Sequence, residues 1–438
     1  MRSLQSQPFR NRLSIISRFR LNYMRPFTLS CALVAAILAV PVPAAAQSPL
    51  IVAAKSRPAA RSSAPAQTVP DAPANPPVVL QAPGAPAAPS IAAASWVLVD
   101  TLSGQTLGAS NADERRDPAS LTKLMTAYVA FAALRAKSIA PAQMVNVSER
   151  AWKAGGSRMF IEPRRPVTVD ELMHGMIIQS GNDATIALAE KLGGTEAGFV
   201  QIMNQYATRL GMKNTHFENC WGAPAPGHYS SAMDLATLSR ALIRDFPDYY
   251  RYYSEREFTW NKHKQPNRNG LLARDPSVDG IKTGHTESAG YGLASSAKRG
   301  DMRLISVVLG TKGFKQREDA SATLLNYGFT FFETVKAKGA GEVVLKPEVY
   351  KGDEDMVTLV PQHDVFVTLG RGGVAQLKTA ATVKEPVIAP IAKGQALGEL
   401  TVTDGNDVIA RVPLVAKEAV PEGGWWTRMT DGIALWMR

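Results

Sequence analysis

Cysteine and histidine, the residues that most often build disulfides and metal sites, are scarce in this chain of 438 residues. Cys31 lies in an N-terminal segment that we expect to be removed, which leaves Cys220 without a partner for an internal disulfide. A buried structural thiol is therefore the simplest role for Cys220. The six histidines show neither of the spacings typical of helical zinc sites, and no glycine-rich phosphate-binding loop is present. The sequence accordingly predicts no metal and no cofactor.

Acidic residues are absent from the first 46 residues, which hold six arginines. This segment and the next, to residue 93, carry most of the net charge of +11, so residues 94–438 carry an excess of only three. Nucleic-acid-binding domains concentrate positive charge on their folded part. The charge distribution therefore argues against nucleic acid as a partner.

The arginine-rich start leads into an apolar run from Phe27 to Val40 and then into three alanines at 44–46. Basic, apolar and small-residue regions in this order predict a secretory signal peptide over residues 1–46, with Met24 as a second candidate start. A retained membrane span is the alternative, but the run of 14 residues is shorter than the roughly 20 that a spanning helix needs. We expect the protein to be exported.

Aromatic residues are also absent from residues 47–93, where 24 of 47 residues are alanine or proline. Such a segment cannot bury enough apolar surface to offset the entropy lost on ordering, so it predicts a flexible tether. Residues 94–338 read as a domain of helices and strands, and residues 339–417 as a small β domain. The expected elements include helices over 127–134, 170–178, 183–192, 197–210 and 317–335, and strands over 96–99, 290–296 and 303–309.

Three short motifs occur in order: Ser120-Leu121-Thr122-Lys123, Ser180-Gly181-Asn182 and Lys282-Thr283-Gly284. A Ser-x-x-Lys match alone is expected about once or twice by chance in a chain of this length, but the ordered trio is a strong signal. An apolar stretch follows Pro118, which predicts that Ser120 and Lys123 face each other in the first turns of a helix. A second match, from Ser295 to Lys298, falls in a strand pattern that points its two side chains to opposite faces.

A serine hydroxyl becomes a good nucleophile only when a neighbouring base takes its proton. Lys123 can be that base only with a neutral amine, which requires its pKa to be lowered by burial or by a nearby cation such as Lys282. In the alternative interpretation, Ser120 caps a helix and Lys123 is solvated, which leaves the ordered trio unexplained. The residues thus favour a serine enzyme that forms an acyl intermediate.

The order of the three motifs resembles that of the penicillin-recognising serine enzymes, which include penicillin-binding proteins and serine β-lactamases. The longer strings at residues 118–127, 179–184 and 278–286 look like the low-molecular-mass D-alanyl-D-alanine carboxypeptidases. This resemblance implies a two-lobed α/β catalytic domain like that of β-lactamases and penicillin-binding proteins, then a small all-β domain and a C-terminal amphipathic helix. It also implies removal of the terminal D-alanine from peptidoglycan stem peptides and covalent binding of β-lactam antibiotics.

The resemblance further implies a role for each motif residue. Ser120 would be acylated by the penultimate D-alanine with Lys123 as its base, and the backbone amides of Ser120 and His285 would form an oxyanion hole. Ser180 and Asn182 would relay a proton and hold the peptide amide. The expected substrate-binding residues are Asn182, Lys282, Thr283, Gly284, His285 and Arg317.

Two positions leave alternatives open. Arg317 would help to bind the carboxylate of the substrate, although a solvent-exposed arginine at the start of a helix is an equal alternative. Trp221 stands where close relatives have histidine, so no role of that histidine in deacylation is carried over to this chain.

The last residues, 422–438, form a further pattern. Within an arc of about 120° on a helix lie six apolar side chains: Trp425, Trp426, Met429, Ile433, Trp436 and Met437. Tryptophans on one stripe of a short terminal helix are typical of a bilayer interface, where amphipathic rings settle. We therefore expect an anchor helix at the periplasmic face of the cytoplasmic membrane, with packing against the protein's own core as the alternative.

Two other functions remain open from the residues alone. A β-lactamase that activates water with a glutamate would need that glutamate after the second motif, whereas Glu162 precedes it and Glu385 lies in the expected β domain. A wall-binding scaffold would keep the motifs only as a ligand cleft. A stable penicillin adduct on Ser120 would distinguish the enzyme from the scaffold.

Overall fold

The computed structural model describes residues 85–437, so the predicted signal peptide lies outside the described residues. The predicted tether, residues 47–93, lies partly within them. For its last nine residues, 85–93, the prediction of a flexible segment is wrong. Ala88 is buried in a cluster that contains Trp96, and the hydroxyl of Tyr327 donates to the carbonyl of Pro86 at 2.9 Å. Residues 85–93 therefore pack on the folded domain, because small apolar side chains there cover large apolar ones that composition does not reveal.

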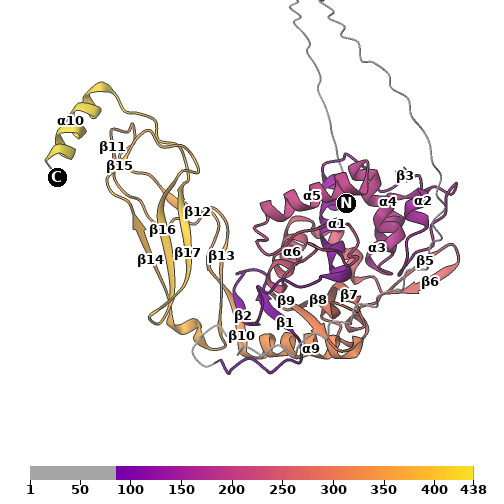
Figure 1. Ribbon diagram of the computed structural model, residues 1–438. Helices are drawn as coiled ribbons and strands as arrows, with labels where there is room; N and C mark the ends of the chain where they lie inside the picture. The colour runs from indigo at the N-terminus through magenta and orange to yellow at the C-terminus, as the bar shows by residue number, and fades with distance from the viewer. Residues whose placement is uncertain (1–84, 438) are drawn as a thin grey trace, which may run out of the picture. The chain divides into compact units, whose positions relative to one another are not determined.

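A five-stranded antiparallel sheet forms the centre of the first domain (Figure 1). Its strands are β1 (Ser95–Asp100), β2 (Thr106–Ser110), β7 (Val278–Thr286), β8 (Gly290–Arg299) and β9 (Met302–Thr311), in the order β2-β1-β9-β8-β7. The three predicted strands correspond to β1, β8 and β9. In β1, Trp96 and Leu98 belong to one apolar cluster and Val97 and Val99 to another. Because alternate residues of a strand point to opposite faces, the sheet is buried on both sides.

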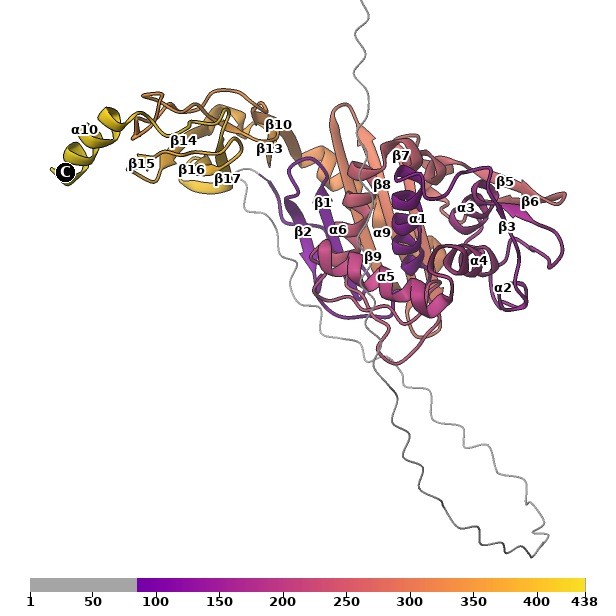
Figure 2. The ribbon, with the colours of Figure 1, turned by 90° about the horizontal axis from the view of Figure 1, so that it is seen from above.

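Helices cover the two faces of the sheet. Helix α9 (Phe314–Phe331) packs on β8 and β9 from one side, and α6 (Ala232–Asp245) packs on β1 and β9 from the other. Figure 1 shows α9 below the strands and α6 with α1 (Lys123–Arg135) above them. Figure 2 shows the same helices from above, with α1 beside β7 and β8. The first motif thus lies between the sheet and the remaining helices.

The remaining helices form a lobe around α1. Its predicted helices correspond to α1, α3 (Val169–Ile177), α4 (Asn182–Gly193) and α5 (Glu196–Arg209), and Thr168 caps the N-terminus of α3 in a capping box that includes Glu171. The other elements of this domain are β3 (Met144–Val145), α2 (Glu149–Trp152), β4 (Val167–Thr168), α7 (Pro247–Tyr250), β5 (Glu257–Trp260), β6 (His263–Pro266) and α8 (Leu271–Arg274).

The helix predicted over 317–335 ends at Phe331, which corrects its C-terminal boundary. Residues from Phe332 onward form strand β10 (Phe332–Lys338), which pairs with β13 (Val365–Gly370). Phe332, Thr334 and Val335 are aromatic or β-branched, and the partner strand decides the conformation of the whole segment. The rest of the β domain consists of β11 (Val349–Tyr350), β12 (Leu359–Pro361), β14 (Leu377–Val383), β15 (Val387–Ile388), β16 (Ala396–Asp404) and β17 (Asp407–Ala416).

The last described element is helix α10 (Trp425–Trp436). Its Asp431 carboxylate accepts a hydrogen bond from the backbone N–H of Lys351 at 2.5 Å. No helix within residues 85–437 is long and apolar enough to span a bilayer.

Candidate active site

The first motif forms a tight turn at the start of α1. Ser120 lies in a short 3-10 helix, η1 (Ala119–Thr122), and Lys123 is the first residue of α1. This differs slightly from the expected regular helix, but it keeps the two side chains one turn apart. The Nζ atom of Lys123 lies 2.9 Å from Oγ of Ser120.

Lys123 is almost completely buried, with 1% of its surface exposed. Besides Ser120, its Nζ contacts Oδ1 of Asn182 at 2.8 Å and the carbonyl oxygen of Trp221 at 2.6 Å. Both of these oxygens can only accept hydrogen bonds. A neutral amine has two N–H groups, which is enough to satisfy both oxygens and leaves its lone pair available to the hydroxyl of Ser120.

The environment of Lys123 favours this neutral form. Burial is the largest cause that lowers its pKa, to about 7, and the charge of Arg268 lowers the pKa further, while Cys220 and, to a smaller extent, Asp183 oppose the shift. The sequence suggested Lys282 as the neighbouring cation. In the structure Arg268, which sequence reasoning missed, has that effect on Lys123.

The second motif lies at the start of α4. Ser180 has a left-handed backbone conformation, with φ of 63°, and its buried Oγ has no hydrogen-bond partner among the described residues. Asn182 is fixed at both ends of its amide, because Oδ1 contacts Lys123 and Nδ2 donates to the carbonyl of Gly155 at 2.7 Å. A strained serine with an unsatisfied hydroxyl is a feature common at functional sites.

The third motif lies on β7, next to the nucleophile turn. Lys282 and Thr283 are buried, and a Cβ on Gly284 would lie 3.0 Å from the carbonyl oxygen of Pro118. Glycine therefore allows β7 to approach the turn that carries Ser120. Burial lowers the pKa of Lys282 well below its ordinary value, and the charges of Lys123, Arg268 and Arg317 add to this shift.

Arg317 lies near the start of α9 and is 7% exposed, so the solvent-exposed alternative is wrong. It donates through one terminal nitrogen to the carbonyl of Gly284 at 3.1 Å. Its buried Nε has no partner among the described residues. His285, in contrast, is exposed, and its ring centroid lies 4.0 Å from that of Tyr291. Arg317 thus adds a positive charge and a free donor beside the third motif.

The second Ser-x-x-Lys match has no such arrangement. Ser295 is buried in β8, where its hydroxyl donates to the carbonyl of Gly280 at 3.3 Å. Lys298 is exposed near the end of the same strand. Only the first match therefore combines a serine with a buried amine.

Comparisons with known proteins identify the family. Residues 82–313 match the family described as D-alanyl-D-alanine carboxypeptidase, and residues 332–422 match the C-terminal domain of penicillin-binding protein 5. The chain belongs to the D-alanyl-D-alanine carboxypeptidase family. This result confirms the predicted fold and class of serine hydrolase for the chain.

Relatives of this carboxypeptidase family match over most of the chain. The D-alanyl-D-alanine carboxypeptidase DacA of Escherichia coli K12 is 43% identical over 80% of this chain and 89% of its own length. DacC of the same strain is 45% identical, with the same coverage. Penicillin-binding protein 5 from Haemophilus influenzae has a TM-score of 0.73 at 44% identity, covering 76% of this chain and 99% of its own. A Listeria monocytogenes penicillin-binding protein D2, solved with ampicillin bound, covers 55% of this chain at 31% identity and a TM-score of 0.51.

Gly222 is a further residue of the candidate site that sequence reasoning missed. Gly222 has a φ of 91°, and a Cβ there would collide with the carbonyl oxygen of Ala119. Its neighbour Trp221 supplies the carbonyl that holds Lys123. A single glycine outside any motif gives no signal in one sequence, because its importance depends on a close approach between distant segments.

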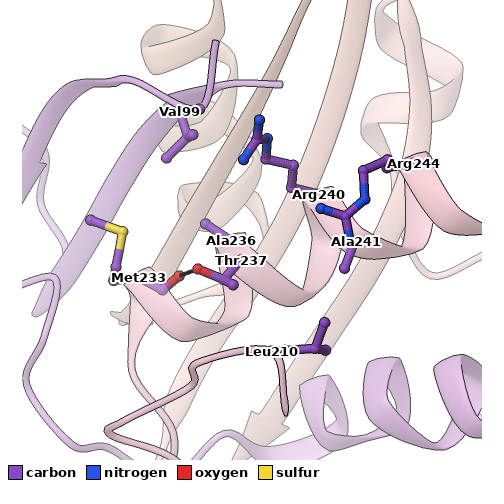
Figure 3. Close-up of a pocket in the computed structure, with 9 residues that line it drawn as sticks. Val99, Leu210, Met233, Ala236, Thr237, Arg240, Ala241 and Arg244 are labelled. Carbon is purple, nitrogen blue, oxygen red and sulfur yellow. Dashed lines mark hydrogen bonds between the residues drawn. The ribbon is translucent and has the colours of Figure 1, made fainter. Parts of the chain in front are cut away.

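A separate cavity of about 220 Å³ lies along α6, and Figure 3 shows Arg240 and Arg244 beside it. Val99 and Leu210 contribute apolar lining. Arg240 is already engaged, because its Nε donates to the carbonyl of Thr101 at 2.6 Å. No residue of the three motifs lines this cavity, so it is distinct from the candidate active site.

Proposed function

We propose that the protein removes the terminal D-alanine from peptidoglycan stem peptides through an ester on Ser120. The observation that carries this proposal is the buried amine of Lys123, whose Nζ lies 2.9 Å from Oγ of Ser120. Lys123 takes the proton of the hydroxyl as Oγ attacks the carbonyl carbon of the penultimate D-alanine. The proton then passes, with Ser180 as relay, to the nitrogen of the departing D-alanine as the peptide bond breaks. Water hydrolyses the ester and restores Ser120.

The substrate is held by groups on both sides of this serine. Backbone N–H groups of Ser120 and His285 stabilise the negative oxygen of the tetrahedral intermediate. The terminal carboxylate binds beside Lys282, Thr283 and Arg317. Its negative charge offsets the cost of burying the cationic side chains of Lys282 and Arg317. Asn182 holds the peptide amide of the substrate. Gly284 permits β7 to lie close enough to the nucleophile for these contacts.

β-Lactam antibiotics would acylate the same serine, because their strained amide presents a similar carbonyl. Incubation of the protein with benzylpenicillin should add the mass of one intact penicillin to a peptide that contains Ser120. The protein should also release D-alanine from a pentapeptide that ends in D-alanyl-D-alanine. Mass spectrometry and a D-alanine assay measure the two results. An adduct on another residue, or no adduct and no release, would contradict the proposal and favour a scaffold.

The protein would act at the periplasmic face of the cytoplasmic membrane, held there by α10. The six apolar side chains of the predicted stripe are all exposed, between 39% for Met429 and 86% for Trp436. They do not pack on the protein's own core, whereas Asp431 on the other face bonds to Lys351. A helix with one exposed apolar face and a docked polar face suits a bilayer interface.

Removal of residues 424–438 should move the protein from the membrane fraction to the soluble periplasmic fraction. This truncation keeps the hydrogen bond from Gly423 to the carbonyl of Lys351. Replacing Trp426 and Ile433 with glutamate should lower membrane partition at least about tenfold, because buried apolar area provides most of the binding. Cell fractionation with immunoblotting measures the distribution.

Arg428→Glu provides a matched control for the double replacement. It changes the net charge by the same two units but lies off the apolar stripe, so the protein should stay mostly membrane-bound. Turnover of a short peptide should remain unchanged in every variant, since the site lies in the other domain. If the truncated protein stayed with the membrane, the anchor would lie elsewhere in the chain.

A further inference from the structure

Asp117 links the two chain segments that carry the proposed oxyanion donors. Its Oδ1 accepts a hydrogen bond from the backbone N–H of Ala119 at 2.9 Å, in the turn before Ser120. Its Oδ2 accepts from the hydroxyls of Thr286 at 2.9 Å and Ser288 at 2.6 Å, at the end of β7. One carboxylate therefore joins the nucleophile turn to the residue that follows His285.

The hydroxyl of Thr286 extends this link into the turn between β7 and β8. Thr286 donates to Asp117 and accepts a hydrogen bond from the backbone N–H of Ala289 at 3.0 Å. The same hydroxyl thus closes the turn and fixes it to the carboxylate. The end of β7 cannot shift without breaking at least one of these bonds.

The nucleophile turn itself has a conformation that needs support. Ala119 has a φ of 48°, in the left-handed region that costs a non-glycine residue about 1 kcal/mol or more. Its carbonyl lies against Gly222, and Pro118 lies against Gly284. The turn is therefore wedged between two backbone segments, and the bond from Ala119 to Asp117 is the side-chain contact that holds its N–H direction.

We infer that Asp117 is a positioning residue that fixes the distance between the backbone N–H groups of Ser120 and His285. This inference rests on the proposed function, in which these two groups form the oxyanion hole. Donors fixed in advance stabilise a developing charge without reorganisation during the reaction. Only Pro118 lies between Asp117 and the Ala119–Ser120 peptide. On the other side, the Asp117 carboxylate contacts Thr286, the residue after His285. It acts through these segments and does not touch the substrate.

Asp117 affects acylation through the geometry of the oxyanion donors and not through the protonation of Lys123. The charges that shift the pKa of Lys123 belong to Cys220, Arg268 and Asp183, and Asp117 is not among these groups. Loss of Asp117 should therefore lower the acylation rate without moving its pH dependence. Loss of a residue that only stabilised the fold would lower the unfolding temperature and leave the acylation rate of the folded protein unchanged.

The test compares three variants by the rate constant of acylation with benzylpenicillin across pH 5 to 9. Asp117→Ala should reduce this rate constant about 10- to 100-fold, since complete loss of an oxyanion donor costs roughly 100- to 1000-fold. Asp117→Asn, which keeps an acceptor for Ala119, should stay within about fivefold of the wild type. The double variant Thr286→Val, Ser288→Ala should be impaired about tenfold, with the pH midpoint unchanged in all three.

Coupling provides a second, sharper readout. Adding Asp117→Ala to the Thr286→Val, Ser288→Ala protein should lower the rate no further than Asp117→Ala alone, because both changes break one link. Asp275→Asn is the matched control, since Asp275 accepts a backbone N–H and a hydroxyl from Ser277 before the other end of β7. It should leave acylation within about twofold.

Several results would overturn the inference. If the acylation rate constant of Asp117→Ala were within threefold of the wild-type value, whatever its unfolding temperature, Asp117 would have only a structural role. A shifted pH midpoint would place its effect on Lys123 instead. If Asp117→Ala did not fold, unimpaired acylation by the Thr286→Val, Ser288→Ala protein would overturn the inference equally. If the wild type formed no adduct, the proposed function would fail, and with it the premise of this inference.

Discussion

Ser120→Ala should abolish covalent labelling by penicillin and reduce release of D-alanine at least about a thousandfold. Without Oγ no ester can form, and the remaining groups of the site cannot replace a nucleophile. The amine of Lys123 should still be buried, because Asn182 and the carbonyl of Trp221 keep two of its three contacts. The variant should therefore fold and still bind the peptide. Intact-protein mass spectrometry and a D-alanine assay measure the two effects.

Ser295→Ala is the matched control for this variant. Ser295 belongs to the same Ser-x-x-Lys pattern, but its hydroxyl bonds only to the carbonyl of Gly280 within β8. Its loss should leave labelling and turnover within about threefold of the wild type. Labelling that survived in Ser120→Ala would show that another residue is the nucleophile.

The sequence predicted the components of the site better than their environment. Three ordered motifs and the strings around them indicated the family, and the family comparison confirmed it. The burial of Lys123 was required by the chemistry but was not visible in the motif. It arises because Asn182 and Trp221, both distant in sequence, surround the amine. Such convergence is a property of the tertiary structure and leaves no local pattern.

Other differences have equally specific causes. Arg268 was not singled out, because an arginine after a short hairpin has no periodic or motif signal, yet its Nε donates to the carbonyl of Gln179 beside the second motif at 3.0 Å. The helix predicted to reach Val335 ends at Phe331, since Phe332 pairs with Gly370 of β13. Local pattern reading cannot detect a partner strand that lies far along the chain.

The positive charges of the site explain why a carboxylate suits it. The charge of Arg268 lowers the pKa values of Lys123, Lys282 and Arg317, and the charges of Lys123 and Arg317 also lower the pKa of Lys282. Burial lowers the pKa of Arg317 as well, with the charge of Arg268 adding to the shift and Glu318 opposing it. A bound carboxylate would favour the charged forms of Lys282 and Arg317. In the proposed mechanism Lys123 acts as a neutral base, and its position between two carbonyl acceptors and Ser120 separates its role from theirs.

Replacing Lys123 with arginine should reduce acylation at least about a thousandfold, within the 100- to 10,000-fold range of general base catalysis. A guanidinium keeps its proton at any pH the protein tolerates, so it cannot accept the proton of Ser120. Lys123→Met should have a similar effect without the charge. Lys298→Arg is the matched control from the second Ser-x-x-Lys pattern, and it should acylate normally because Lys298 is exposed.

In the wild type, the same assignment fixes the pH dependence of acylation. The pKa of Lys123 is lowered to about 7, so the amine is mostly neutral above this pH and mostly charged below it. The acylation rate constant should therefore be nearly constant above pH 8 and fall about tenfold for each pH unit below 6. An amine with its ordinary pKa near 10.5 would instead give rates that still rise between pH 8 and 10. Stopped-time mass spectrometry of the penicillin adduct measures the profile, and an active Lys123→Arg protein with this same profile would show that another group is the base.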